Sequence, residues 1–311
     1  MASPASNVPS KVSSTDPTSC APRFETLTVI LVSYNSRDIL RQTAPPLRDL
    51  AHVVIVDNAS DDDTVAVAKA LLPNATVHAS PVNLGFGRAN NVALEQATTP
   101  FALLLNPDCR FDPAMVQRLL DAAARYPNAA ILAPCLHDAR GKAQVAYDGP
   151  FWQRGGPPYL EPSGDLCADF LPGAALLLRL ERFRDVGYFD PAIFMYYEDD
   201  DLCLRLRRAG HALVLVQDAT LEHLVGQSSR RTLRLLHRKY FHEMASRLYV
   251  WSKYRGRAPA LKLAAKLALT NLLKLPLFAL TFNGHMTVRS LGRVQAALKA
   301  FVRIKPRGDA A

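Results

Sequence analysis

Leu27-Thr-Val-Ile-Leu-Val-Ser-Tyr-Asn35 opens the part of the chain that decides the fold. Two apolar runs of the same kind follow it, His52-Val-Val-Ile-Val56 and Phe101-Ala-Leu-Leu-Leu105. Runs rich in β-branched residues or leucine, without polar alternation, are typical of strands buried on both faces of a parallel sheet. Helical patterns alternate with these strands, over residues 61–72, 88–96 and 113–126. The alternation predicts an α/β fold with a mainly parallel sheet flanked by helices.

The same patterns continue further along the chain. Strands are predicted at 130–133, 174–178 and 212–216, and a helix at 202–209 that ends before Gly210. No strand pattern follows after about Gly226.

The predicted organisation has three parts. Residues 1–23 are rich in Ser, Pro, Thr and Ala without apolar periodicity, which predicts a disordered leader. Residues 24–228 are predicted to form the α/β domain, and residues 229–311 a basic helical tail.

Charge is divided unevenly between domain and tail. Residues 230–311 hold 18 Lys and Arg beside two acids, a net charge of +16, whereas residues 1–229 carry −7. A strongly basic segment predicts an anionic partner, which could be phospholipid, nucleic acid or a phosphate-rich substrate. A basic surface that only aids solubility is the alternative. The composition, 49% hydrophobic, excludes disorder throughout, and five scattered cysteines exclude a disulfide framework and favour a reducing compartment.

The basic tail is partly apolar. Residues 231–254 predict a long basic helix, and residues 258–282 form an apolar run that contains Lys262, Lys266 and Lys274. These lysines fall on roughly one helix face, and charges inside the run argue against a membrane-spanning helix. An amphipathic helix in a membrane interface fits better, because its lysines can reach the headgroups. A helix packed on the α/β domain is the alternative.

Polar side chains follow the first three predicted strands where each strand ends. Ser33 and Asn35 follow the first strand, Asp57 the second, and Asn106 and Asp108 the third. Ligands of open α/β sheets bind outside the carboxyl ends of the strands. We therefore expect these residues on one rim of the sheet, although a single Asp at a strand end is about as often a helix cap.

A glycine-containing loop precedes the second predicted helix. Asn83-Leu-Gly-Phe-Gly87 is followed by Arg88, and the backbone N–H groups together with Arg88 could face an anion. The spacing is neither that of a dinucleotide-binding fingerprint nor that of a P-loop.

Glu198-Asp-Asp-Asp201 is the densest acidic cluster. Four successive acids repel one another unless they are solvated, cap a helix or face a cation. The aromatic and apolar residues 194–197 could raise the pKa of one carboxylate and make it a general base. A solvated helix start is the alternative. His223 could hold a divalent ion with Asp108 if the fold brings them together, and is otherwise a structural histidine.

Together these motifs resemble the family 2 inverting glycosyltransferases with the GT-A fold, and are most similar to the bacterial rhamnosyltransferase-like branch. The resemblance extends from about Thr26 to Gly226. Eight motifs in order carry it: Val-Ser-Tyr-Asn (32–35), Val-Asp-Asn-Ala-Ser (56–60), Asn-Leu-Gly-Phe-Gly (83–87), Leu-Asn-Pro-Asp (105–108), Pro-Gly-Ala (172–174), Phe-Asp-Pro (189–191), Glu-Asp-Asp-Asp-Leu-Cys-Leu-Arg (198–205) and Glu-His (222–223).

The resemblance implies a role for each matching residue. Asp108 matches the last Asp of the family's D-x-D metal motif, and His223 matches a histidine that helps to hold the metal or the diphosphate. Asp199 matches the general base. The residues implied to bind the donor are Ser33, Asn35, Asp57, Asn83, Arg88 and Asn106.

One motif departs from the family pattern. Asn106-Pro-Asp108 offers a single carboxylate where many members have two, and Asn106 could supply a carbonyl ligand or bind the sugar. The Gln-x-x-Arg-Trp segment of processive synthases is absent from the sequence, which implies one sugar, or few, added per encounter.

The resemblance therefore implies an inverting, non-processive enzyme that uses Mg²⁺ or Mn²⁺. Its donor would be dTDP-rhamnose or a similar nucleotide sugar, and its acceptor a polyprenyl-linked or cell-envelope glycan. The basic tail would hold it at an anionic membrane surface, cytoplasmic and peripheral on the inner face of the cell membrane. One alternative is a nucleic-acid-binding protein, but no binding module accompanies the basic tail, so we expect no nucleic acid partner. The other is an inactive family member, which only Asn106 supports.

Overall fold

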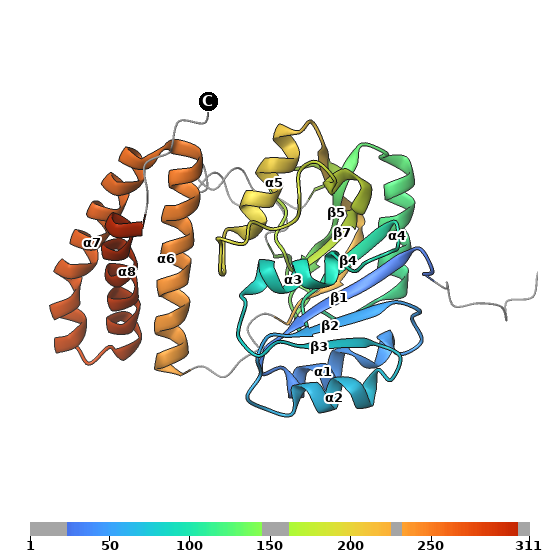
Figure 1. Ribbon diagram of the computed structural model, residues 1–311, viewed down its shortest axis with the longest axis horizontal. Coiled ribbons are helices and arrows are strands. Elements are labelled where there is room, and N and C mark those ends of the chain that lie inside the picture. The colour runs from blue at the N-terminus through green and yellow to red at the C-terminus, as the bar shows by residue number, and fades with distance from the viewer. Residues whose placement is uncertain (1–23, 145–161, 225–231, 304–311) are drawn as a thin grey trace, which may run out of the picture.

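The computed structural model describes residues 24–144, 162–224 and 232–303 (Figure 1). The leader predicted over 1–23 lies outside the described residues. Figure 1 shows one twisted sheet with helices packed around it and a separate group of C-terminal helices beside it.

Eight strands form the sheet, in the order β3-β2-β1-β4-β7-β5-β8-β6. Their bounds are β1 Leu27–Ser33, β2 Val53–Asp57, β3 Thr76–Ala79, β4 Phe101–Leu105, β5 Ala129–His137, β6 Leu166–Cys167, β7 Ala175–Arg179 and β8 Ala212–Glu222. The half made of β3, β2, β1 and β4 is parallel, as the apolar runs predict. In the other half β5 and β8 are parallel, but β7 runs antiparallel to β4 and β5, and β6 antiparallel to β8. The sheet is therefore mixed.

Strand register brings the predicted polar ends together. Ser33 pairs with Asp57 across β1 and β2, and β4 lies on the other side of β1. The strands that lead to this edge are almost wholly buried and apolar, with Val29, Ile55 and Leu103 fully buried. Polar side chains thus begin where the strands emerge from the hydrophobic core, as the sequence predicts.

Five α-helices accompany the sheet: α1 Arg37–Thr43, α2 Thr64–Leu71, α3 Phe86–Leu94, α4 Pro113–Arg125 and α5 Glu198–Arg208. Two short 3₁₀ helices span Pro45–Leu47 and Leu180–Phe183. The Asp112 carboxylate caps α4 by accepting the Ala114 N–H at 2.9 Å, and Pro113 occupies the first helical position. Helix α5 begins four residues before its predicted start, so the acidic cluster forms its first turn, where the helix dipole favours carboxylates.

Three helices follow the sheet: α6 Leu233–Arg255, α7 Arg257–Leu280 and α8 Gly284–Arg303. The sequence predicts the first two, and α8 is an additional finding. Gly256 has a φ of +90° and turns the chain between α6 and α7. Gly292 lets α8 approach α6 closely, because a Cβ there would lie 2.8 Å from the His237 carbonyl oxygen.

Small side chains form the centre of this three-helix unit. Its buried cluster consists of Met244, Leu248, Ala264, Ala268, Ala296, Ala297 and Ala300. Helix α7 turns alanines inward and leucines outward, and Leu273 is 72% exposed, Leu280 78% and Phe282 95%. This arrangement reverses the usual amphipathic helix of a soluble protein.

Helix α7 is, among the described residues, the one helix long and apolar enough to cross a membrane, judged by length and composition alone. Within its most apolar window, 17% is buried inside the protein. The interfacial orientation that its lysines favour stays a prediction.

Candidate active site

The ends of β1 and β2 carry a hydrogen-bonded polar group. The buried Asp57 carboxylate accepts from the Ser33 hydroxyl at 3.3 Å, from the Ser60 N–H at 3.0 Å and from the Ser60 hydroxyl at 2.5 Å. Asn35 lies beside them in a left-handed conformation, with φ of 51°, and accepts the Asp61 N–H at 2.8 Å. The fold thus brings Ser33, Asn35 and Asp57 together with fixed orientations.

Asn58 ties this group to the glycine-containing loop. Its side-chain oxygen accepts the Leu84 N–H at 2.6 Å, and its side-chain nitrogen donates to the Gly85 carbonyl at 3.1 Å. The sequence alone assigns no role to Asn58. Its position one residue after a strand-end Asp is the signal that could have identified it.

Three backbone N–H groups of this loop are already hydrogen-bonded within the protein. The N–H groups of Leu84, Gly85 and Phe86 all have partners, the side-chain oxygens of Asn58 and Asn83 and the carbonyl oxygen of Phe194. These three N–H groups therefore do not face an anion, whereas the expectation for the Gly87 N–H and for the exposed Arg88 side chain stays a prediction.

Close packing explains both glycines of this loop. Gly85 has a φ of +84°, and a Cβ there would lie 1.9 Å from the Phe194 carbonyl oxygen. At Gly87 a Cβ would lie 2.8 Å from Cβ of Phe189. The glycines bring this loop against Phe189, Phe194 and Glu198, the last of which is the first residue of the acidic cluster.

Asp108 and His223 lie side by side. The sequence predicts this contact if the fold brings His223 to the same rim of the sheet as Asp108. Asp108 Oδ1 lies 3.5 Å from Nε2 of His223, and both side chains are largely buried. Nδ1 of His223 lies 3.0 Å from Oε1 of Gln144, whose amide nitrogen donates to the His223 carbonyl at 3.0 Å. That amide orientation places a hydrogen on Nδ1, and Nε2 is the ring nitrogen that faces Asp108.

Two acceptor atoms that face each other across 3.5 Å suit a cation between them. The ligand atoms of Asp108, Cys109 and His223 lie within 4.8 Å of one another. Burial, followed by the charge of Asp108, raises the pKa of the Cys109 thiol, whose sulfur lies 3.5 Å from the Ala174 carbonyl oxygen. The carboxylate and the imidazole are ligand types that fit a divalent cation.

Asp199 lies half-buried in the first turn of α5. Its Oδ2 accepts the Gly173 N–H at 3.1 Å, and its Oδ1 accepts the Asp200 N–H at 3.0 Å. Gly173 belongs to the segment just before β7, and a Cβ there would lie 3.7 Å from the Asp199 side chain. The carboxylate is therefore oriented by backbone groups.

One short segment joins Asp199 to the candidate metal ligands. Gly173 holds Asp199, and the next residue, Ala174, accepts the Asn106 N–H at 2.9 Å and contacts the Cys109 sulfur. Residues about 90 positions apart in the sequence thus lie on opposite sides of the same backbone segment. The antiparallel β7, which the sequence does not predict to be antiparallel, places this segment.

Glu198, next to the predicted base, has the perturbed carboxyl. Burial, followed by the charge of Asp199, raises the pKa of Glu198 well above its ordinary value. Its Oε2 is buried without a hydrogen-bond partner within the described part of the chain. The sequence predicts one carboxylate of the cluster with a raised pKa, and the structure assigns that property to Glu198.

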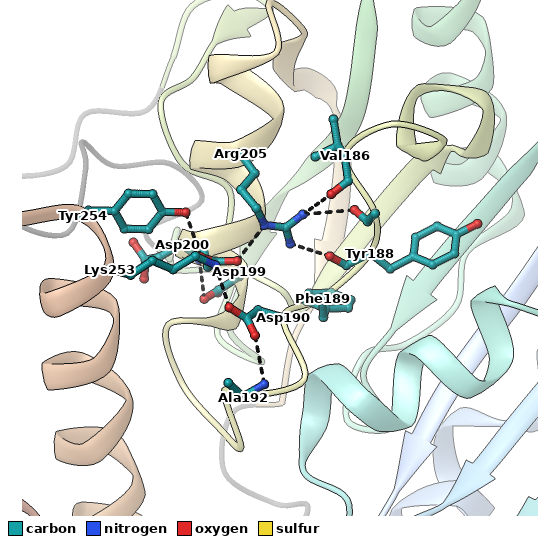
Figure 2. Close-up of polar contacts among 12 residues, drawn as sticks. Val186, Tyr188, Phe189, Asp190, Ala192, Asp199, Asp200, Arg205, Lys253 and Tyr254 are labelled. Carbon is teal, nitrogen blue, oxygen red and sulfur yellow. Dashed lines mark hydrogen bonds and ion pairs between the residues drawn. The ribbon is translucent and has the colours of Figure 1, made fainter. Parts of the chain in front are cut away.

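Asp201 is surrounded by cationic and hydroxyl groups from two helices, namely Arg205 of α5 and Lys253 and Tyr254 of α6, which Figure 2 labels. It is fully buried and accepts from Arg205 at 2.8 Å, from Lys253 at 2.7 Å and from the Tyr254 hydroxyl at 2.8 Å. Lys253 also contacts Asp190 at 2.6 Å. Although burial alone would raise it, the hydrogen bonds from Lys253 and the Ala192 N–H lower the pKa of Asp190. Helix α6 therefore contacts both the loop that precedes α5, at Asp190, and the first turn of α5, at Asp201.

That loop contains local backbone strain. Tyr196 and Tyr197 both have a φ of 67°, a left-handed conformation that non-glycine residues rarely adopt in succession. Helix α6 supports the loop, because the Ser246 hydroxyl donates to the Met195 carbonyl at 2.8 Å and Val250 packs with Ile193. Burial raises the pKa of Tyr196 to about 12. Helix α6 of the tail thus contacts the strained loop that leads into α5. The sequence does not indicate this contact.

Comparisons with known proteins agree with this geometry. The family model "Glycosyl transferase family 2" matches residues 28–181. The N-acetylglucosaminyl-diphospho-decaprenol L-rhamnosyltransferase of Mycobacterium tuberculosis is 34% identical over 212 residues, which cover 58% of this chain and 68% of that relative.

Solved structures share the fold at low identity. The mannosyltransferase PcManGT from Pyrobaculum calidifontis, in complex with GDP-Man and Mn²⁺, has a TM-score of 0.54 and 18% identity, covering 92% of this chain and 88% of its own. Residues 1–349 of S. aureus TarS have a TM-score of 0.51 and 15% identity, covering 88% and 91%. Sheet and neighbours together identify the GT-A fold. The chain belongs to the family 2 glycosyltransferases, in their rhamnosyltransferase-like branch.

Proposed function

We propose that this glycosyltransferase moves rhamnose from dTDP-rhamnose to a polyprenyl-diphosphate-linked glycan, one sugar per encounter and with inversion at the anomeric carbon. The observation that carries the proposal is the segment Gly173–Ala174, which holds the Asp199 carboxylate on one side and the Asn106–Cys109 segment on the other. A base and a cation site thereby lie close to each other, as direct displacement of a diphosphate requires.

Asp199 is the proposed general base. Its carboxylate takes the proton of an acceptor hydroxyl as that oxygen bonds to the anomeric carbon, and the bond from that carbon to the nucleoside diphosphate breaks. The Gly173 and Asp200 N–H groups orient the carboxylate, and its half-buried position leaves it accessible to an acceptor.

Asp108 and His223 are the proposed cation ligands. Mn²⁺ or Mg²⁺ held there would neutralise charge on the diphosphate leaving group, and the imidazole ligand favours Mn²⁺. Gln144 fixes the ring of His223 with its Nε2 toward Asp108.

The remaining residues line the proposed donor site. Asp57 and Ser33 would contact the base or ribose, and Asn83 uses its oxygen on Gly85, which leaves its amide N–H groups for the donor. The full proposed donor-binding set is Ser33, Asn35, Asp57, Asn83, Arg88 and Asn106.

Similarity to the mycobacterial relative supports the choice of donor and acceptor, because that protein is named a rhamnosyltransferase acting on N-acetylglucosaminyl-diphospho-decaprenol. The test is a panel of nucleotide sugars, each with and without Mn²⁺ or Mg²⁺, offered with a polyprenyl-diphosphate N-acetylglucosamine acceptor. We expect transfer from dTDP-rhamnose that depends on the cation. Transfer of a different sugar under the same conditions would contradict the donor assignment, and cation-independent transfer would contradict the metal site.

We also propose that α7 attaches the enzyme to the inner, cytoplasmic face of the cell membrane. The second half of the helix exposes Leu273, Leu277 and Leu280, and Phe282 follows it. Exposed apolar groups of this density mark a surface that binds a membrane or a partner. The 16 excess positive charges of residues 230–311 favour anionic lipid by about 1 kcal/mol for each residue near the surface.

Vesicle co-sedimentation tests this attachment. We expect binding to phosphatidylglycerol-containing vesicles and loss of binding in the double variant Leu273→Asp, Leu277→Asp, with vesicles of neutral lipid as the control. Release by alkaline carbonate would support an interfacial helix, and retention would support a crossing helix. Stronger retention on DNA than on vesicles at high salt would favour the nucleic-acid alternative.

A further inference from the structure

A cavity of about 700 Å³ lies between α6, α8 and the loop that precedes α5. This volume is within the roughly 300–1,000 Å³ of small-molecule sites. Phe194 from the loop, Phe241 and Leu248 from α6, and Ala296 and Ala300 from α8 contribute the apolar lining. The cavity therefore depends on contact between the catalytic domain and the C-terminal helices.

Positive charge surrounds this apolar space. Lys253, Arg257 and Lys299 line the cavity, and its lining includes no carboxylate. Lys253 is occupied by Asp190 and Asp201, but within the described residues Arg257 and Lys299 form no ion pair, and both are exposed. Two cations are thus available at the mouth of an apolar cavity.

His242 shows how positive the surroundings are. Its ring stacks on Phe194 with centroids 4.1 Å apart. Burial, and then the charges of Arg238 and Lys299, lower the pKa of His242 to about 4. At neutral pH the imidazole adds a flat, uncharged surface to the cavity, and the charge comes from the lysine and arginine side chains.

The cavity adjoins the catalytic machinery. Phe194 accepts the Phe86 N–H with its carbonyl at 3.1 Å, and Lys253 contacts Asp201, two residues after Asp199. A ligand seated here would lie against the strained loop that leads to the proposed base. Apolar walls, a cationic mouth and this location together describe a site for an anionic amphiphile beside the acceptor position.

We propose that this cavity binds the diphosphate and the first isoprenoid units of the polyprenyl carrier, with phosphate oxygens at Arg257 and Lys299 and the prenyl chain against Phe194 and Phe241. The assignment rests on the proposed function, because it takes the acceptor to be carried by a prenyl diphosphate. It adds a binding site for the carrier that is separate from the nucleotide-sugar site on the sheet rim.

Farnesyl diphosphate is the probe, titrated into the full-length protein by isothermal calorimetry. We expect the double variant Arg257→Met, Lys299→Met to weaken its binding at least about 10-fold, because both proposed phosphate-binding cations are removed. A second variant, Ala245→Phe, fills the cavity from α6 without changing charge and should weaken binding similarly. The matched control, Lys69→Met with Arg184→Met, removes two exposed cations from the catalytic domain and should leave binding unchanged.

Two competitors separate prenyl diphosphate from other phosphate sources. Pyrophosphate that binds as tightly as farnesyl diphosphate would overturn the role of the apolar walls. Phosphatidylglycerol that competes equally well would overturn the choice of the carrier in favour of bulk lipid. Unchanged farnesyl diphosphate affinity in both cavity variants would overturn the site.

Measuring the KM values for donor and acceptor separately distinguishes a failure of the carrier site from a failure of the proposed function. In the double variant we expect an unchanged KM for dTDP-rhamnose and a KM for the lipid-linked acceptor raised at least about 10-fold. If the protein ignores dTDP-rhamnose but binds farnesyl diphosphate through Arg257 and Lys299, the donor assignment fails and the carrier site stands. If donor turnover is normal and the acceptor KM does not change, the carrier site fails and the function stands.

Discussion

The sheet domain and the three-helix unit bury different kinds of side chain. Leucine, isoleucine and valine fill the core of the sheet, whereas alanines dominate the core of the helical unit, which turns leucines such as Leu273 to the outside. The sheet domain therefore has a hydrophobic core of its own. The helical unit buries Met244 and Leu248 but leaves larger apolar residues such as Leu273 and Leu280 exposed.

Their junction differs from both interiors because it is polar and charged. Lys253, Tyr249 and Tyr254 of α6 contact Asp190 and Asp201 of the catalytic domain. A buried ion pair adds little to folding stability compared with an apolar pair of the same size. The loss of one partner, however, leaves an uncompensated buried charge that destabilises the fold. The comparison teaches that the proposed catalytic residues lie in the sheet domain, while the helical unit contacts the loop that leads to the proposed base.

Replacement of the base should give the largest effect and should affect the sheet domain alone. In Asp199→Asn the amide still accepts the Gly173 N–H but cannot take a proton, so kcat should fall about 1,000-fold. Steady-state transfer assays measure the loss, and donor binding by calorimetry should stay unchanged. Asp185→Asn removes an exposed carboxylate as the control. Turnover near the unmodified level in Asp199→Asn would disprove the base assignment.

Breaking the junction should affect both regions. Lys253→Met leaves Asp190 and Asp201 short of their shared cation and should lower the free energy of unfolding by about 3 kcal/mol, together with kcat. Urea denaturation and transfer assays measure the two effects, and Lys253→Arg should restore part of each because it keeps the charge. Equal stability of Lys253→Met and the exposed-site control Lys69→Met would show that the Lys253 ion pairs do not join the regions.

The candidate cation site tests the sheet domain more finely. Gln144→Leu removes the partner of His223 Nδ1, so the ring loses its orientation, and the affinity for Mn²⁺ should fall about 10- to 100-fold. Titration of the metal against thermal stability measures the affinity, which the helical unit should not influence. Lys253→Met serves here as the comparison variant. An unaltered metal titration in Gln144→Leu would contradict the assigned ring orientation.

Acid should weaken the junction slightly through His242. Its pKa of about 4 lies below the ordinary value, so between about pH 6.5 and 4 the unfolded chain binds more protons than the folded one. The free energy of unfolding should therefore fall as the pH falls through this window. His242→Gln removes this contribution and should flatten the pH dependence in urea denaturation. A slope identical to that of the unmodified protein would show that His242 does not titrate across unfolding.

Much of the sheet domain could be predicted because its signals are local. Buried parallel strands need continuous apolar runs. Polar residues such as Asp57 and Asp108 therefore occur at the carboxyl ends of the strands or just after them. The direction of β7 could not be predicted, because strand direction depends on distant partners that a single apolar run does not specify.

Three amide groups of the glycine-containing loop were misassigned for a related reason. Glycine permits both anion binding and close packing, and the sequence alone does not distinguish them. Only the approach of Phe194 shows that Gly85 serves packing.

The sequence by itself determined the α/β core, the polar rim, the acidic helix and the contrast between an acidic domain and a basic tail, because each depends on periodicity or composition along a short stretch. Tertiary structure alone decided which carboxylate is oriented by backbone N–H groups, which is buried with a raised pKa and which is held by cationic side chains. Asp199, Glu198 and Asp201 are near neighbours with almost the same chemistry, but they differ in burial and partners. The partners of Asp199 and Asp201 include Gly173, just before β7, and Lys253 and Tyr254 of α6, and only folding brings these segments to one helix turn.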